Sequence, residues 1–179
     1  MTEIHIECAP NDEELSAAAK TLLALCVEKN ITVASAESCT GGMIGKVITD
    51  IPGSSAVFVG GMMTYTNDVK IRSLGVDAHL IDAYTEVSAP VAAQMAEKIC
   101  EKLHAVCGVS ATGYAGPGGG SERDPVGTVY IGVAKEGEVQ TARMSAPPDA
   151  SRDDVRRMAT AVALQRLTAL VDGDKKNKL

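Results

Sequence analysis

Residues 31–42 have the sequence ITVASAESCTGG, and the architecture of the chain follows from them. The largely apolar residues 31–35 predict a short buried strand, and Gly41-Gly42 predicts a tight turn a few residues later. The next apolar residues, at positions 43, 44, 47 and 48, have helical spacing up to Pro52-Gly53. This stretch therefore predicts a strand, a tight turn and a helix in succession.

Strands and helices also alternate on both sides of this unit. Helices are predicted at residues 13–29, 43–48, 67–74, 89–103 and 152–170, and strands at residues 31–35, 56–65, 105–111, 127–134 and 139–144. Asn11 or Asp12 is expected to cap the first helix, Asn30 to end it, and Ser88 to cap the fourth. The sequence Lys135-Glu136-Gly137-Glu138 predicts a hairpin, so at least one strand is antiparallel. The whole pattern predicts a three-layer α/β domain.

Composition and length predict a single globular domain over residues 1–179, with its core at about residues 13–170 and a polar tail at 172–179. The chain has 17 basic and 23 acidic side chains, and only 3% of its residues are aromatic. This balance disfavours nucleic acids and anionic membranes as partners. The sequence has no membrane span and no signal peptide, so we expect a cytoplasmic protein. Five cysteines without a C-x-x-C pair predict neither a disulfide framework nor a zinc site.

Ligands of α/β sheets bind beyond strand ends, and the two most glycine-rich turns both follow predicted strands. We therefore expect one pocket lined by residues 37–42 and 113–120. The first turn is not a P-loop, because Thr40 stands where a glycine is required and Val47 where Ser or Thr must follow the lysine. The amides of Thr40 to Met43 can still point at an anion. Alternatively, the glycines only permit a sharp turn.

Ser38 stands at this turn, where a nucleophile is exposed beside backbone amides that can form an oxyanion hole. A serine needs a base, and the three histidines are poorly placed for that role. His5 is in an N-terminal arm, His79 in a polar connection and His104 at a helix end. Histidines at such positions are more often surface or capping residues than catalytic ones.

Lys70 is the attractive base, because a lysine of lowered pKa can replace histidine and this one follows a strand expected beside the first. Its spacing alone, however, favours a solvated helix lysine over a catalytic one. Cys39 is an alternative nucleophile, since a helix N-terminus lowers the pKa of a thiol. Glu37 could bind a metal or act as a base, but no cluster of further ligands lies near it in the sequence.

Four ordered motifs resemble the CinA C-terminal domain family, the bacterial nicotinamide mononucleotide (NMN) deamidases. They are Ala36-Glu37-Ser38-Cys39-Thr40-Gly41-Gly42, Tyr65-Thr66-Asn67-Asp68-Val69-Lys70, Val87-Ser88, and Ala115-Gly116-Pro117-Gly118-Gly119-Gly120 followed by Pro125-Val126-Gly127-Thr128-Val129. The resemblance spans about Glu13 to Leu170. It implies an α/β/α sandwich with a five-stranded mixed sheet, one strand being antiparallel. It also implies hydrolysis of NMN to nicotinate mononucleotide and ammonia without a cofactor or metal, and we expect a homodimer.

By motif position, the resemblance implies that Ser38 is the nucleophile, Lys70 its base and Tyr65 a supporting hydroxyl. The residues expected to bind the substrate are Glu37, Thr40, Gly41, Gly42, Gly116, Gly118, Gly119, Gly120 and Arg152. Family members usually approach the last helix with Gly-Asp-Arg, where this chain has Ala150-Ser151-Arg152 and only the arginine matches. Larger members also carry an N-terminal domain similar to molybdopterin-binding domains, whereas the resemblance here covers the deamidase-like part.

Two other functions fit the same residues. A non-catalytic nucleotide-binding or competence-associated module would keep the fold without turnover, and a related amidase would act on another substrate. A binding module has no use for a serine beside a lysine of lowered pKa. Ser38, Tyr65 and Lys70 therefore favour an enzyme of pyridine nucleotide salvage.

Overall fold

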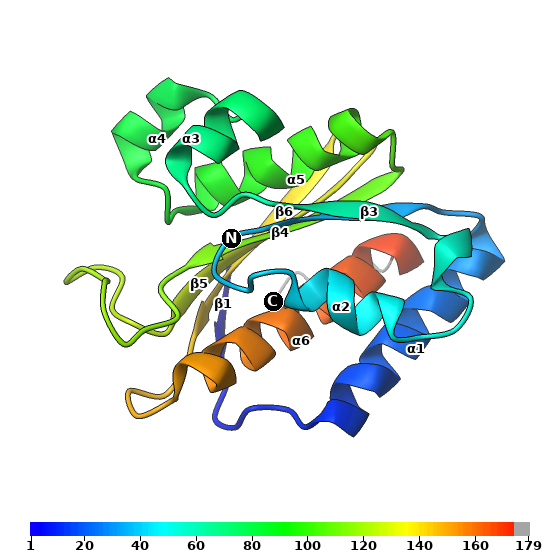
Figure 1. Ribbon diagram of the computed structural model, residues 1–179, viewed down its shortest axis with the longest axis horizontal. Helices are drawn as coiled ribbons and strands as arrows, with labels where there is room; N and C mark the ends of the chain where they lie inside the picture. Colours follow the sequence, from blue (N-terminus) through cyan, green and yellow to red (C-terminus); the bar gives the residue numbers. More distant parts are fainter. Residues whose placement is uncertain (174–179) are drawn as a thin grey trace.

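The computed structural model describes residues 1–173 of the chain (Figure 1). In chain order the elements are β1 (Thr2–His5), α1 (Asp12–Lys29), β2 (Val33–Glu37), α2 (Met43–Thr49), a 3-10 turn (Ser54–Ala56), β3 (Phe58–Met63), α3 (Asn67–Val69), a π-helical turn (Lys70–Leu74), α4 (Ala78–Tyr84), α5 (Ala89–Leu103), β4 (Cys107–Gly113), β5 (Thr128–Lys135), β6 (Glu138–Ser145) and α6 (Arg152–Asp172). The predicted polar tail lies, from residue 174 on, outside the described residues. Within residues 1–173 no helix is long and apolar enough to cross a lipid bilayer.

One mixed sheet with the strand order β1-β6-β5-β4-β2-β3 forms the middle layer. β2 pairs in parallel with β3 and β4, and β1 pairs in parallel with β6. β5 is antiparallel to both of its neighbours, β4 and β6. The α/β fold and the single reversed strand are confirmed, but the sheet has six strands rather than five.

The additional strand is β1, in the segment interpreted from the sequence as an N-terminal arm. It has four residues of alternating burial and lies at the edge of the sheet, where Thr2 pairs with Ala142 and His5 with Ser145. A strand of this length is too short for an alternating pattern to identify it. Its ladder depends on β6, which is more than a hundred residues away in the sequence.

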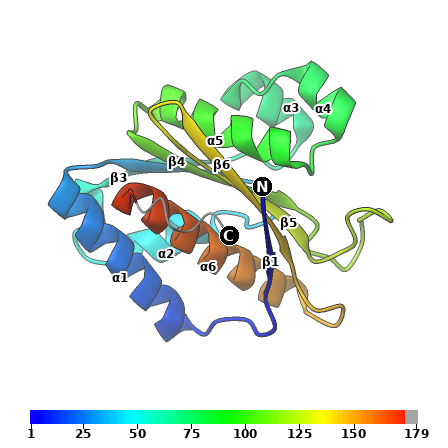
Figure 2. The same cartoon turned by 180° about the vertical axis from the view of Figure 1, so that it is seen from behind.

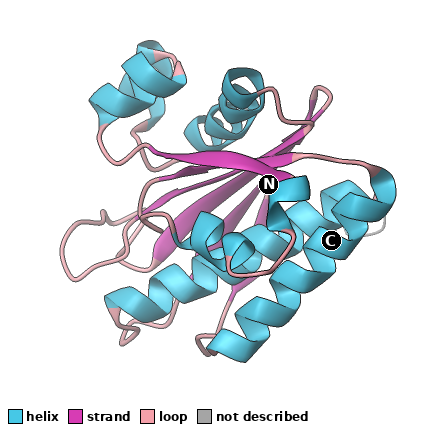
Figure 3. Ribbon diagram, turned by 45° about the vertical axis from the view of Figure 1, so that its right-hand side comes forward, coloured by secondary structure: helices cyan, strands magenta, loops and turns pink. Residues whose placement is uncertain are grey.

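Helices cover both faces of the sheet (Figures 1 and 2). α1, α2 and α6 pack on one face, where Leu22 and Leu164 are fully buried. α5, α4 and the segment 67–74 cover the other face, where Met95 and Ile99 are fully buried. Figure 3 shows the sheet between these two groups of helices. Because both faces are covered, a ligand can reach the sheet only at its strand ends.

Local sequence signals explain the first helix and the last hairpin. Asn11 and Glu14 form a complete capping box at the start of α1, and Asn30 ends the helix in the left-handed conformation. Glu136 and Gly137 both have positive φ, as the two-residue turn between β5 and β6 requires. The predictions of the Asn11 cap, the Asn30 stop and the hairpin are confirmed.

Three details near the other helices differ from the predictions. Residues 67–74 form one turn of α-helix followed by a π-helical turn, not one continuous helix. The polar connection that contains His79 includes α4, whose only buried residue is Ile81, so no apolar stripe marks it in the sequence. Ser88 precedes α5 as predicted, but its hydroxyl donates to the Thr85 carbonyl instead of capping the helix.

Candidate active site

A pocket of about 220 Å³ opens beyond the C-terminal ends of β2, β3 and β4. Ser38 follows β2 directly, and Thr112 lies near the end of β4. We call this cavity the Ser38 pocket; its lining residues are Ser38, Cys39, Tyr65, Lys70, Glu86, Val87, Thr112, Gly113, Tyr114, Ala115, Gly116, Gly118 and Arg152. Parts of both glycine-rich turns line it, so the two turns share one pocket as predicted.

Ser38 and Lys70 meet in this pocket. Lys70 Nζ lies 3.2 Å from Ser38 Oγ and donates a hydrogen bond to the Thr64 carbonyl at 2.9 Å. Both side chains are buried, with Lys70 1% and Ser38 8% exposed. The parallel pairing of β2 with β3 brings together the segments that follow these two strands. The interpretation of Lys70 as a solvated helix lysine is therefore wrong.

The environment of Lys70 favours its neutral form. Lys70 begins the π-helical turn, and such turns occur frequently at functional sites. Burial lowers the pKa of Lys70, while the negative charge of Glu86 and that of an ionised Cys39 act in the opposite direction. A lysine of lowered pKa has a larger fraction of neutral amine, which is the form that can accept a proton.

Cys39 is next to Ser38, but its thiol is not activated. The side chain is buried, and this burial raises its pKa to about 12. The thiolate is the reactive form of cysteine, and at neutral pH this group stays protonated. The expectation that the helix N-terminus lowers the pKa of Cys39 is therefore wrong, because desolvation outweighs the favourable backbone groups around the sulfur.

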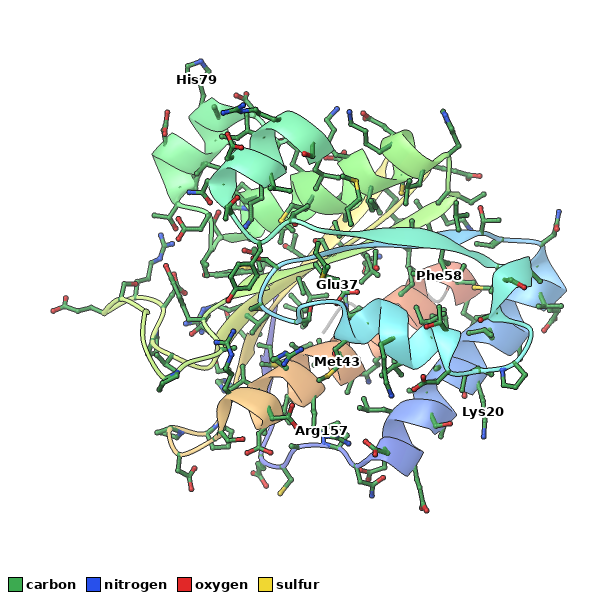
Figure 4. All side chains as sticks on the ribbon, in the orientation of Figure 1. Lys20, Glu37, Met43, Phe58, His79 and Arg157 are labelled. Atoms are coloured by element: carbon green, nitrogen blue, oxygen red, sulfur yellow. The ribbon has the colours of Figure 1, made fainter. Side chains whose placement is uncertain are left out.

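The N-terminus of α2 is occupied by a side chain of the protein itself. The Glu37 carboxylate accepts hydrogen bonds from Ile44 N at 3.0 Å and from Gly45 N at 2.8 Å. Figure 4 shows Glu37 beside α2 at the end of its strand. Two further amides of the turn bond to carbonyls within it. The Glu37 carboxylate thus takes the place of an anion at the Ile44 and Gly45 amides, and the Gly41 and Met43 amides are also engaged, so two of the four amides predicted to face an anion are unavailable.

Glu37 itself is 2% exposed and does not line the Ser38 pocket. Its carboxylate also accepts a hydrogen bond from Ser35 Oγ at 3.1 Å, so both of its oxygens have partners. Its position gives no support to the predicted contact with the substrate or to the alternative of a metal ligand. Its observed contacts join β2 to the start of α2 and so hold the turn that carries Ser38.

The predicted substrate-binding glycines fall into two groups. Gly116 and Gly118 line the Ser38 pocket. Four glycines lie outside its lining and have positive φ, namely Gly41, Gly42, Gly119 and Gly120. At Gly120 a Cβ atom would also lie only 2.8 Å from Val126 N. These four residues shape the turns, since side chains rarely adopt this backbone conformation.

Arg152, at the start of α6, connects two loops at the pocket. Its Nη1 donates to the Gly116 carbonyl at 2.6 Å, and its Nη2 donates to the Tyr65 hydroxyl at 3.1 Å. Tyr65 lines the pocket but is 61% exposed, and its hydroxyl contacts Arg152 rather than Ser38 or Lys70. A guanidinium has five N–H donors, so Arg152 can hold these two groups and still bind an anion.

Arg156 is a residue near the site that the sequence analysis did not identify. Its Nε and Nη2 donate to the Thr40 carbonyl at 3.2 and 2.9 Å. Thr40 is fully buried and lies outside the lining of the Ser38 pocket, so the structure does not place it in contact with a ligand. Arg156 connects α6 to the turn that carries Ser38. No sequence signal distinguishes it from a solvated arginine, because its partner is a backbone carbonyl far away in the chain.

Glu86 and Thr112 also line the pocket and were not predicted, whereas Tyr114 lies within the predicted lining 113–120. Thr112 Oγ1 donates to the Glu86 carbonyl at 2.7 Å, which connects the end of β4 to the segment before α5. Glu86 directly precedes the Val87-Ser88 motif, and this position is the sequence feature that could have identified Glu86 as a pocket residue.

Other parts of the molecule are less suited to catalysis. Within the described part of the chain, no group of three or more His, Cys, Asp or Glu side chains could hold a metal ion. A larger surface hollow, of about 740 Å³, lies between α1 and α6 and contains none of the predicted site residues. The Ser38 pocket is therefore the candidate active site.

Comparisons with known proteins agree with the motifs. The family model of the CinA C-terminal domain matches residues 15–171. A CinA-like protein from Gemmatimonas aurantiaca is 44% identical over 156 residues, which are 87% of this chain and 35% of that protein. The crystal structure of a competence/damage inducible protein from Agrobacterium tumefaciens is 37% identical with a TM-score of 0.85, covering 92% of this chain and 99% of that one. A CinA superfamily protein from Escherichia coli is 28% identical with a TM-score of 0.84, covering 90% and 93%.

The chain spans only 26% to 40% of the length of the curated relatives that it matches. The names of these relatives refer to CinA or to competence and damage induction, and they state no reaction. The chemistry has to be argued from the Ser38 pocket.

Proposed function

The chain belongs to the CinA C-terminal domain family, and we propose that it is an amidohydrolase that converts NMN and water to nicotinate mononucleotide and ammonia. The observation that carries this proposal is the 3.2 Å distance between Lys70 Nζ and Ser38 Oγ in a buried pocket. Burying a lysine costs free energy, and that cost disfavours its charged form. A neutral amine beside a serine hydroxyl is the arrangement that activates a nucleophile.

The reaction follows as two acyl transfers. Neutral Lys70 takes the Ser38 proton while Oγ attacks the carbonyl carbon of the amide, which gives a tetrahedral intermediate. The C–N bond then breaks, Lys70 returns the proton to the leaving nitrogen, and ammonia departs. A water molecule attacks the acyl-serine with Lys70 again as the base. The bond between the acyl carbon and Oγ then breaks, Lys70 returns the proton to Ser38 Oγ, and nicotinate mononucleotide is released. The Thr64 carbonyl accepts one Lys70 N–H, and this contact orients the amine next to Ser38.

Cys39 N–H is the available donor for the oxyanion of this intermediate. Cys39 directly follows the nucleophile and lines the pocket, and within residues 1–173 its N–H donates to no backbone carbonyl. The Ser38 amide is not available, because it donates to the Ala111 carbonyl at 2.9 Å. Preorganised amides of this kind stabilise the negative charge that develops during attack.

The substrate phosphate is assigned to Arg152, whose side chain lines the pocket. We expect Arg152→Ala to weaken the binding of NMN about tenfold or more, because it removes a charge-assisted bidentate contact. The binding of nicotinamide riboside, which lacks the phosphate, should be weakened much less. The measurement is the KM for each compound. Equal losses would instead show that Arg152 acts by holding Gly116 and Tyr65 in place.

The proposed function is tested by ammonia release from NMN compared with nicotinamide, nicotinamide riboside and NAD. NMN should be the preferred substrate, and a chelator should leave the rate unchanged. Activity that is lost with the chelator and restored by zinc or magnesium would contradict the serine–lysine mechanism. Binding of NMN without any release of ammonia would favour the non-catalytic module.

The expected homodimer stays a prediction.

A further inference from the structure

Glu86 is the acidic side chain of the Ser38 pocket that the proposed mechanism does not use. It lies between α4 and α5, and its backbone is held by the hydrogen bond from Thr112 Oγ1. The residue is half-buried and lines the same cavity as Ser38, Lys70 and Tyr114. A carboxylate in this place is therefore close to the position of a bound amide.

The Glu86 carboxylate has no partner within the described part of the chain: it accepts no hydrogen bond and forms no salt bridge there. Other buried carboxylates of this protein are fully engaged. Asp124, for example, accepts hydrogen bonds from Tyr130, Arg123 and Arg143. A carboxylate that lines a cavity without a counter-ion attracts a cationic ligand.

The charge of Glu86 acts on the groups around the reacting amide. Burial raises the pKa of Tyr114, and the charge of Glu86 raises it further. Burial lowers the pKa of Lys70, and Glu86 opposes that shift. Glu86, Lys70 and Tyr114 line the same pocket. Tyr114 also offers an aromatic ring, whose face attracts cations.

The substrate of the proposed function carries a positive charge close to its amide. In NMN the ring nitrogen bears the ribose, so the ring is a pyridinium cation, and the carboxamide is attached directly to this ring. When the amide carbon reaches Ser38, the cationic ring must lie in the same small cavity. The phosphate, at the far end of the molecule, has the opposite charge and Arg152 as its candidate partner.

We propose that Glu86, together with the ring of Tyr114, receives the cationic ring and makes the pocket selective for carboxamides on N-alkylated pyridinium rings. This inference rests on the proposed function and deepens it. Glu86 is thereby a specificity-determining residue, and the acid–base chemistry remains with Lys70. The pocket then offers a negative group for the ring and a positive group for the phosphate, which matches a zwitterionic ligand.

The test compares NMN with its reduced form, dihydronicotinamide mononucleotide, in which the ring is uncharged. Dissociation constants are measured by titration calorimetry in the Ser38→Ala protein, so that no turnover occurs. Adding Glu86→Gln should weaken NMN about tenfold and the reduced compound less than twofold, since the variant removes the charge but keeps the size of the side chain. Glu97→Gln, on the exposed surface near the middle of α5 and outside the Ser38 pocket, removes the same charge and should change neither value.

The outcomes separate this inference from the proposed function. Equal weakening of both compounds, or of neither, would overturn the role of Glu86, provided that thermal unfolding shows each variant to be folded. Selective weakening of NMN binding in the Ser38→Ala background, combined with no ammonia release from NMN by the native protein, would support ring recognition and refute the hydrolase. Failure of the Ser38→Ala protein to bind NMN at all would overturn both.

Discussion

Lys70→Arg and Lys70→Met are each expected to lower the rate of NMN deamidation by about 10²- to 10⁴-fold, the usual contribution of a general base. Lys70 Nζ lies 3.2 Å from Ser38 Oγ, and only its neutral form can take the proton. Arginine remains charged at any working pH, so its similar length cannot restore the function. The measurement is kcat/KM for ammonia release, with NMN binding measured in parallel to show that the pocket is intact.

The pH profile of the native enzyme gives a second readout of Lys70. Because burial lowers its pKa, kcat/KM should rise with pH along an acidic limb whose apparent pKa is below the ordinary lysine value of about 10.4. The other charged or titratable side chains of the pocket are Cys39, Tyr65, Glu86, Tyr114 and Arg152. Of these, Glu86 and Cys39 act on the pKa of Lys70, and the Cys39 thiol, whose pKa is about 12, stays neutral over this range. Removing the charge of Glu86 should move the limb to lower pH, because a nearby negative charge favours protonated lysine.

Chemical rescue distinguishes a base from a merely structural lysine. The Lys70→Ala variant leaves room for methylamine, and its activity should return in proportion to the neutral fraction of the added amine. Tetramethylammonium, which has charge but no lone pair, should rescue nothing. High activity in folded Lys70→Arg would contradict the general-base role and leave Lys70 as an electrostatic residue.

Ser38→Ala should have a larger effect than the Lys70 variants. It should lower the rate of NMN deamidation by about 10³-fold or more, because the acyl intermediate can no longer form. NMN should still bind, since the change removes one oxygen atom from the pocket. The matched control is Cys39→Ala at the next position. It should keep most of the activity, because the thiol is protonated at neutral pH and lies outside the proposed chemistry.

A covalent label gives an independent check on this pair of residues. Thiol alkylation of the native protein should leave the activity largely intact, because Cys39 is buried and takes no part in the proposed chemistry. Loss of activity on alkylation, combined with an active Ser38→Ala variant, would reverse the assignment of the nucleophile. Mass spectrometry of the labelled protein identifies which thiol has reacted.

Much of the fold could be predicted because its signals are local. The helical spacing after Gly42, the Asn11 cap and the Glu136-Gly137 turn each lie within a few residues. Periodicity and turn chemistry of this kind depend on the backbone of one segment and its immediate neighbours. The edge strand β1 had no such signal, because it is stabilised by pairing with the distant β6.

The sequence by itself determined the alternation of strands and helices, the reversed strand of the hairpin, and the motifs that contain Ser38, Lys70 and Arg152. Only the tertiary structure decided that Ser38 touches Lys70, that Glu37 fills the N-terminus of α2, and that Glu86 lines the pocket. Burial, pKa and hydrogen-bond partners are properties of an environment built from segments far apart in the chain. They exist only after the strand ends and loops of this sheet have come together.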